Sequence, residues 1–205
     1  MVEFTEERRV MTKTEKAILF AVNAHAGLKR KGKNRPYILH PIEVMTIVGS
    51  ITEDEDILAA AVLHDTIEDT SVTAADIERE FGSSVAKLVS EESEDKRAEL
   101  PAEATWKICK QETINHLKTA NRNTKLICLG DKLANIREMS LDYAKLQDQL
   151  WERFNQKDKA LHAWYYRSIC DVLEEEFGSI PAIREYRSLL KTVFGVGGEL
   201  ADTEV

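Results

Sequence analysis

The chain has 205 residues, of which 43% are hydrophobic and 31% are charged, and its formal net charge at neutral pH is −8. This length and composition are typical of one compact domain with a full hydrophobic core. No segment approaches the ~20 consecutive apolar residues that a membrane helix needs. The negative charge also argues against nucleic acid or a membrane surface as a partner.

The N-terminal segment and the cysteines indicate a cytoplasmic protein. Residues 1–9 lack the basic start and apolar centre of a secretory signal. Cys109, Cys128 and Cys170 are odd in number and far apart, which is typical of buried thiols that stay reduced. Nothing in the sequence indicates an oligomeric state.

Apolar residues recur at helical spacing almost throughout the chain, which predicts an all-α fold. We expect a single domain over residues 12–194, after an N-terminal extension (1–11) and before a disordered tail (195–205). A polar, acidic loop is expected at 91–104. The predicted helices are 13–29 with a threonine cap at Thr12 or Thr14, 41–51, 54–68, 73–89, 106–120, 125–139, 141–176 with a break near Asn155, and 183–193.

The most informative segment runs from His64 to Asp69 and reads His-Asp-Thr-Ile-Glu-Asp. It follows the apolar run 57–63, so a continuous helix would place His64 over Glu68 and Asp65 over Asp69. Three carboxylates so close together repel one another, and keeping them ionised is costly unless a cation is present. We therefore expect a divalent metal ion there.

Two further residues are candidate ligands on separate helices. His40 stands just before Pro41 at the start of one predicted helix, and Asp131 interrupts the apolar helix 125–139. A lone histidine or aspartate of this kind is more often structural than functional. Together with His64 and Asp65, however, they form the set of imidazoles and carboxylates that first-row divalent ions accept in helical bundles.

A basic loop (residues 29–35) places five cations in seven residues of an otherwise acidic protein. Either it is a solvated loop, or it binds an anionic ligand near His40. The basic and aromatic segment 151–166 also has two interpretations. Its side chains either belong to the core and the surface, or they form a platform on which a nucleotide base stacks.

These motifs resemble those of a known family. His40, His64-Asp65 and Asp131 resemble the H…HD…D pattern of HD-domain phosphohydrolases. Segments 30–31, 36–41, 63–69 and 131–137 resemble more narrowly the hydrolase domain of RelA/SpoT proteins, whose single-domain members are small alarmone hydrolases. The similarity covers roughly residues 14–138 and continues more weakly to about residue 176.

The resemblance implies an all-α HD-domain helical bundle and a specific reaction. The family hydrolyses the 3′-pyrophosphate of guanosine tetra- or pentaphosphate to GDP or GTP and pyrophosphate, usually with Mn²⁺ and a metal-bound water as nucleophile. A chain of this length would hydrolyse and not synthesise the nucleotide.

The resemblance also implies roles for individual residues. The metal ligands would be His40, His64, Asp65 and Asp131. Glu68 and Asp69 would orient and deprotonate the attacking water. The substrate contacts would be Arg30, Lys31, Asn135 and Arg137.

Two positions depart from the family pattern. Gly130 stands where alanine is common, and Glu138 adds a carboxylate that would disfavour a highly anionic ligand. An HD-domain hydrolase of another phosphate ester, such as a nucleoside phosphate or NADPH, is therefore an alternative. A non-catalytic nucleotide-binding module is a second alternative.

Overall fold

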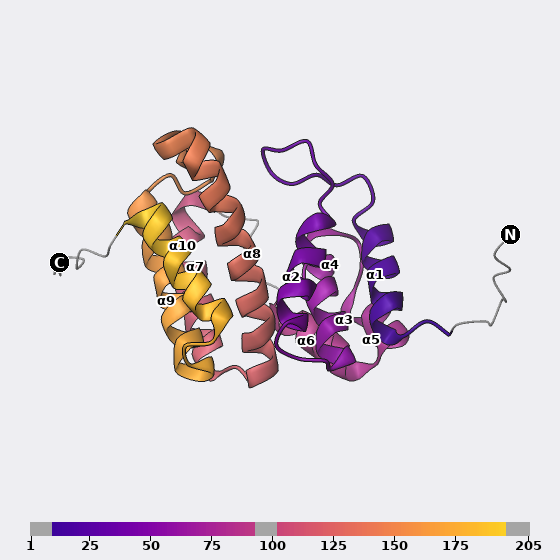
Figure 1. Cartoon of the computed structure of the whole chain (residues 1–205). Helices are drawn as coiled ribbons and strands as arrows, with labels where there is room; N and C mark the ends of the chain where they lie inside the picture. The colour runs from indigo at the N-terminus through magenta and orange to yellow at the C-terminus, as the bar shows by residue number, and fades with distance from the viewer. Residues whose placement is uncertain (1–9, 93–101, 196–205) are drawn as a thin grey trace, which may run out of the picture.

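The computed structural model describes residues 10–92 and 102–195, and these residues are helical apart from turns, loops and one isolated bridge between Lys29 and Pro36 (Figure 1). The predicted all-α fold is therefore confirmed. The helices are α1 (Lys13–Ala24), α2 (Leu39–Gly49), α3 (Glu55–Leu63), α4 (Thr66–Asp69), α5 (Ala74–Phe81), α6 (Ser83–Glu92), α7 (Ala102–Thr119), α8 (Arg122–Leu146), the 3-10 helix η1 (Gln147–Arg153), α9 (Lys159–Phe177) and α10 (Pro181–Phe194).

Helix α8 is the element that joins the two halves of the molecule. Figure 1 shows α1 to α6 gathered on one side of it and α7, α9 and α10 on the other. It packs against α2 most extensively and also against α3, α6, α9, α10 and η1. A side chain that projects from α8 towards α2 therefore lies where the two halves of the molecule meet.

The contact between α2 and α8 is close because α8 has a glycine there. A Cβ atom on Gly130 would lie 2.8 Å from Val48 Cγ2 and 3.1 Å from both Cγ1 and the carbonyl oxygen of Val44. Val44 and Val48 are completely buried. The departure from alanine at position 130 thus lets α2, which carries His40, lie near the backbone of α8.

Local capping explains where several helices begin. Thr12 and Thr73 each form a capping box at the start of α1 and α5, with Glu15 and Asp76 as the reciprocal partners. Asn121 accepts hydrogen bonds from the first turn of α8. Of the two threonines expected to cap the first helix, Thr12 is the cap.

Several predicted helix boundaries were wrong. The predicted helix 54–68 is two helices, because α3 ends at Leu63 and α4 begins at Thr66. The predicted helix 73–89 is broken at Gly82, whose φ of 92° lies in the left-handed region that favours glycine. The helix expected over 13–29 ends at Ala24 and is followed by a turn.

Residues 125–139 and 141–146, predicted as separate helices, form the single helix α8. No proline or glycine interrupts it near Ser140, so the helical hydrogen bonds continue. The chain leaves α-helical geometry at Gln147, where φ is 50° and the 3-10 helix η1 begins. The break predicted near Asn155 is present between η1 and α9.

Some expectations lie mainly outside the described residues. They concern the acidic loop, the N-terminal extension and the C-terminal tail, although the described ends of 91–104 belong to α6 and α7. Cys109, Cys128 and Cys170 are buried thiols. Within 10–92 and 102–195, no helix has the length and apolarity needed to cross a bilayer.

Candidate active site

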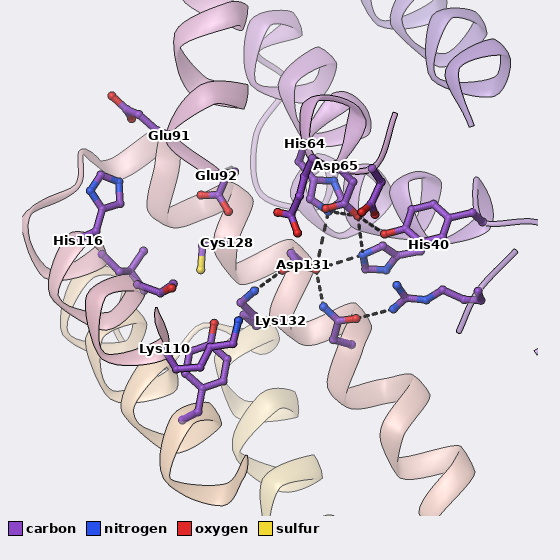
Figure 2. A pocket seen from close by; sticks show the side chains of 18 residues that line it. His40, His64, Asp65, Glu91, Glu92, Lys110, His116, Cys128, Asp131 and Lys132 are labelled. Atoms are coloured by element: carbon purple, nitrogen blue, oxygen red, sulfur yellow. Dashed lines mark hydrogen bonds and ion pairs between the residues drawn. The ribbon is translucent and has the colours of Figure 1, made fainter. Parts of the chain in front are cut away.

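Four side chains from three segments converge between the two halves of the molecule. His40 lies in the first turn of α2, His64 and Asp65 form the junction of α3 and α4, and Asp131 projects from the middle of α8 (Figure 2). His40 Nε2 lies 3.1 Å from Asp131 Oδ1 and 3.6 Å from Asp65 Oδ2. His64 Nε2 lies 3.0 Å from Asp65 Oδ2 and 3.8 Å from Asp131 Oδ1.

The break between α3 and α4 places His64 and Asp65 together. Helix α3 is a buried apolar helix, and Thr66 Oγ1 donates a hydrogen bond to the carbonyl of Leu63 at the break. The predicted continuous helix is therefore interrupted at His64 and Asp65, although Asp69 N still donates to the carbonyl of Asp65 at 2.9 Å. Both residues of the pair face the cluster.

The orientation of His64 suits a metal ligand. Its Nδ1 lies 2.9 Å from the carbonyl oxygen of Ala61, which can only accept, so Nδ1 carries a proton. Its buried Nε2 has no hydrogen-bond partner among the described residues. Once Nε2 loses its proton it offers a lone pair on the side of the two carboxylates, while Nδ1 stays bonded to the backbone, which is the usual arrangement of a metal-binding histidine.

The carboxylates are held from outside the cluster. The Tyr37 hydroxyl donates to Asp65 Oδ2 at 2.7 Å. Lys132 Nζ lies 2.5 Å from Asp131 Oδ2, and Asn135 Nδ2 donates to Asp131 Oδ1 at 2.5 Å. Such outer contacts orient ligand oxygens before a metal binds.

The electrostatics of the cluster require a positive charge at its centre. Burial lowers the pKa of His64, but the Asp65 and Asp131 carboxylates outweigh it and raise this pKa to about 9. Burial raises the pKa of Asp65, but the nearby imidazoles outweigh burial and hold it well below its usual value. Two carboxylates therefore stay charged beside the imidazoles, and a divalent ion can replace the protons that otherwise balance them.

The donor set fits a divalent metal ion. Ligand atoms of His40, His64 and Asp65 all lie within 4.8 Å of one another, and Asp131 Oδ1 adjoins both imidazoles. Two nitrogen and two carboxylate donors are acceptable to several first-row ions, so this set alone does not select one metal.

A cavity of about 200 Å³ opens beside the cluster. Glu68 and Asp69 of α4 form part of its wall, and Arg30 and Asn135 form another part. The structure thus brings two acidic residues and two candidate substrate contacts to the same cavity as the candidate ligands.

The cavity also has walls that the sequence prediction did not include. Glu92 ends α6, and Lys110 and Lys132 place their ammonium groups 5.2 and 5.9 Å from the centre of the Tyr165 ring (Figure 2). Burial raises the pKa of Glu92 to about 8. Of Glu92, Lys110 and Lys132, only Lys132 could have been noticed in the sequence, because it follows Asp131 within an apolar helix.

A second cavity of about 200 Å³ shares Arg30 and Asn135 with the first. Lys31 lines it, and Phe154 and Tyr166 supply aromatic surface. Members of the segment 151–166 therefore line both cavities, since Tyr165 lines the first, whereas others, such as the buried Trp151, belong to the core.

The basic loop is neither freely solvated nor open to an anion on all sides. Arg30 Nε donates to Glu138 Oε2 at 2.9 Å, and an Arg30 NH2 group donates to Asn135 Oδ1 at 2.5 Å. Arg35 and Lys33 also pair with Glu138, at 2.9 and 2.7 Å. Helix α8 therefore neutralises much of the loop's charge.

The structure does not bring Arg137 to either cavity. Its guanidinium forms a two-pronged contact with Glu185, at 2.6 and 2.8 Å, and a 3.4 Å contact with Glu43. In an α-helix, residue 137 points away from the face that carries Asp131, Asn135 and Glu138. The expected substrate contact by Arg137 is thus not supported by its position.

Comparisons with known proteins agree with this architecture. Residues 17–158 match the family described as HD domain. The chain is 36% identical over 125 residues to the zebrafish (Danio rerio) protein named guanosine-3′,5′-bis(diphosphate) 3′-pyrophosphohydrolase MESH1, a match that covers 59% of this chain and 66% of that relative. The matched part is therefore just under two thirds of that relative's length.

Two solved structures are similar over most of the chain. One is described as a metazoan ortholog of SpoT that hydrolyses ppGpp, and it superposes with a TM-score of 0.70 at 26% identity, covering 91% of this chain and 98% of that one. The other is a protein of Listeria monocytogenes, with a TM-score of 0.64 at 33% identity, covering 82% of this chain and all of that one.

Proposed function

The chain belongs to the HD-domain family, and from that premise we propose that it removes the 3′-pyrophosphate from guanosine 3′,5′-bis(diphosphate)-like nucleotides. The products would be GDP or GTP and pyrophosphate. The observation that carries this proposal is the convergence of His40, His64, Asp65 and Asp131 beside a cavity that Glu68 and Asp69 also line. We take residues 12–194 as the catalytic domain and the cytoplasm as its location.

We assign His40, His64, Asp65 and Asp131 as the residues that would hold one divalent ion, with Mn²⁺ as the metal that the family resemblance favours. When bound, such an ion lowers the pKa of a coordinated water and neutralises charge on phosphoryl oxygens. The buried Nε2 of His64 makes no hydrogen bond within the described residues yet lies close to both carboxylates, and this feature of the chain best supports the assignment.

The chain's own residues would perform the rest of the reaction. The oxygen of water forms a bond to the phosphorus attached to the 3′ oxygen, the bond from phosphorus to that oxygen breaks, and the 3′ oxygen takes up a proton. Glu68 or Asp69 accepts the proton that water loses, a role that typically contributes ~10²–10⁴-fold to a rate. Asn135 and Arg30 orient the ribose and phosphates, because amide and guanidinium donors match phosphoryl oxygens.

The direct test incubates the purified protein with guanosine tetraphosphate and Mn²⁺ and measures GDP and pyrophosphate. Nucleoside phosphates and NADPH are run in parallel, because an HD-domain hydrolase of another phosphate ester would share the metal cluster. Turnover of one of those compounds with none of guanosine tetraphosphate would transfer the substrate assignment. Binding without turnover of any compound would favour a nucleotide-binding module.

A second test separates the metal ligands from the proposed base. Glu68→Ala should keep its metal content, measured by elemental analysis, while turnover collapses. Loss of the metal together with activity would make Glu68 a ligand and refute its proposed role.

A further inference from the structure

One face of α8 carries both the candidate metal ligand and the contacts to the basic loop. Asp131, Asn135, Glu138 and Asp142 recur at helical spacing along this face. Asp131 belongs to the metal cluster, Asn135 contacts Arg30, and Glu138 lies one further turn along the helix. The basic loop therefore lies along the same helix that sets the position of Asp131.

Glu138 is the centre of the contacts that hold the basic loop. Its side chain is only 13% exposed and pairs with Arg30, Lys33 and Arg35 at 2.7 to 2.9 Å. Asp142 extends the network, because it pairs with Lys33 at 2.8 Å and with Arg153 of η1 at 2.5 Å. Ion pairs that share partners in a partly buried network are worth more than isolated surface pairs.

The backbone of the basic loop also lies close to the side chain of Arg153 in η1. Gly32 has a φ of 72°, and a Cβ atom there would lie 2.7 Å from Nε and 2.8 Å from Cδ of Arg153. The loop is also closed on itself, because Arg30 N donates to the carbonyl of Arg35 at 3.2 Å. This close approach and the ion pairs together indicate one docked position for the loop.

The docked position determines how Arg30 faces the two cavities. Glu138 accepts from its Nε and Asn135 accepts from one terminal nitrogen, so two of the guanidinium's donors fix the plane of the group. The same group lies 5.4 Å from the centre of the Tyr37 ring. Arg30 lines both cavities, so the guanidinium N–H groups that Glu138 and Asn135 do not engage lie at the walls of these cavities.

We propose that Glu138 is a positioning residue of the nucleotide site, which fastens the basic loop to α8 and so presents Arg30 to an anionic substrate. This inference rests on the proposed function for the identity of the substrate. It reverses the expectation that Glu138 opposes an anion, because three cations compensate its charge. Its carboxylate orders the cations that an anionic ligand needs.

The first experiment tests the docking without any substrate. The basic loop offers trypsin cleavage sites after Lys29, Arg30, Lys31 and Lys33, whereas Arg35 precedes a proline that blocks cleavage. In native full-length protein, Glu138→Ala should be cut in this loop about tenfold faster than wild type, because the loop opens more often. Glu185→Gln, which removes an ion pair to α8 outside both cavities, should be cut at the wild-type rate.

The protease experiment has clear contrary outcomes. Equal cleavage of Glu138→Ala and wild type in the basic loop would overturn the proposal, as would an equal acceleration in Glu185→Gln. Cleavage sites are identified by mass spectrometry, so general unfolding is recognised by cuts throughout the chain. If Glu138→Ala does not fold, Glu138→Gln keeps the side-chain shape, removes only the charge and carries the same test.

The second experiment tests action through Arg30. With guanosine tetraphosphate, Glu138→Gln and Glu138→Ala should raise KM about tenfold and change kcat less than about threefold, because the lost contacts of Arg30 stabilise the bound substrate and the transition state equally. In an Arg30→Ala background, Glu138→Ala should then raise KM little further, since the two residues act as one unit. Glu185→Gln should keep both kinetic constants.

A lower KM in the Glu138 variants would show that the carboxylate repels the substrate and would overturn the proposal. The proposal would also be overturned if the effects of Glu138→Ala and Arg30→Ala on KM were fully additive in the double variant. If the wild type does not hydrolyse the nucleotide, the proposed function fails, and the protease comparison still decides whether Glu138 holds the loop.

Discussion

His64 Nδ1 lies 2.9 Å from the carbonyl oxygen of Ala61, so the backbone of α3 decides which ring nitrogen of His64 faces the carboxylates. Nδ1–H donates a hydrogen bond to the carbonyl, and this leaves Nε2 beside Asp65, at 3.0 Å from its Oδ2. The C-terminal end of α3 thus sets the tautomer of His64 and, through it, the ring nitrogen that faces the candidate metal site. The same relationship makes His64 a sensitive position for testing metal binding.

His64→Gln should abolish stabilisation of the protein by Mn²⁺. Ligand at a hundredfold excess over its dissociation constant stabilises a folded protein by ~2.7 kcal/mol, which a thermal melt resolves easily. His116→Gln is the matched control, because His116 lines the same cavity away from the cluster (Figure 2). A retained thermal shift in His64→Gln, or its loss in His116→Gln, would contradict the assigned ligands.

Tyr37→Phe should weaken Mn²⁺ binding while leaving all four candidate ligands in place. The Tyr37 hydroxyl donates to Asp65 Oδ2, and burial together with Asp65 raises the pKa of this phenol far above its usual value, so it remains a donor. Loss of such an outer contact typically costs about 10–100-fold in metal affinity. Titration calorimetry measures the change.

Tyr143→Phe is the control for Tyr37→Phe. Its hydroxyl accepts from Lys159 at 2.7 Å, away from the cluster, so metal affinity should be unchanged. Equal affinities in the wild type and Tyr37→Phe would mean that Asp65 needs no help from the phenol.

Gly130→Ala should destabilise the protein. Alanine gains about 1 kcal/mol of helix propensity over glycine, but overpacking of a close contact costs about 1–3 kcal/mol. Here the new Cβ atom would meet Val48 at 2.8 Å and the backbone of Val44 at 3.1 Å, so we expect the cost to prevail and Tm to fall. Metal affinity should fall with it, because α2 carries His40.

Gly49→Ala provides the comparison for Gly130→Ala. Its Cβ atom would meet only Leu58 Cδ2, at 3.4 Å, which is ordinary contact. Its Tm should therefore stay level or rise. Equal Tm values for the two variants would refute the close approach of α2 and α8 at Gly130.

The stabilisation by Glu138 should depend on pH. Burial raises the pKa of Glu138, but Lys33 and Arg30 outweigh it and hold this pKa below the ordinary value of 4.5. A carboxyl with a depressed pKa contributes stability above its unfolded pKa and loses it as pH falls through the folded pKa. Between wild type and Glu138→Gln, the difference in unfolding free energy should be about 1–2 kcal/mol at neutral pH.

That difference should shrink once the pH is below 4.5 and vanish when Glu138 is protonated in the folded protein. Denaturant unfolding of both proteins across this range measures it. A difference that stays constant down to the lowest pH at which both fold would show that charge on Glu138 does not hold the basic loop.

The sequence was most informative where structure depends on neighbours in the chain. Apolar spacing and capping residues such as Thr12 and Thr73 predicted an all-α chain, because helical hydrogen bonds and caps join residues three or four positions apart. The break at Gly82 was missed, since glycine is tolerated within a helical pattern and only its backbone φ reveals the turn.

The sequence by itself determined the helical class and the order in which His40, His64-Asp65 and Asp131 occur. Only the tertiary structure decided which charges meet: Arg30 faces Glu138 across 108 positions of sequence, and Arg137 turns to Glu185, away from the two cavities that Arg30 lines. The physical reason is the separation in sequence between the residues that interact. A helix forms through contacts within one turn, whereas the partner of a charged side chain depends on how whole helices pack, and here that depends on α8.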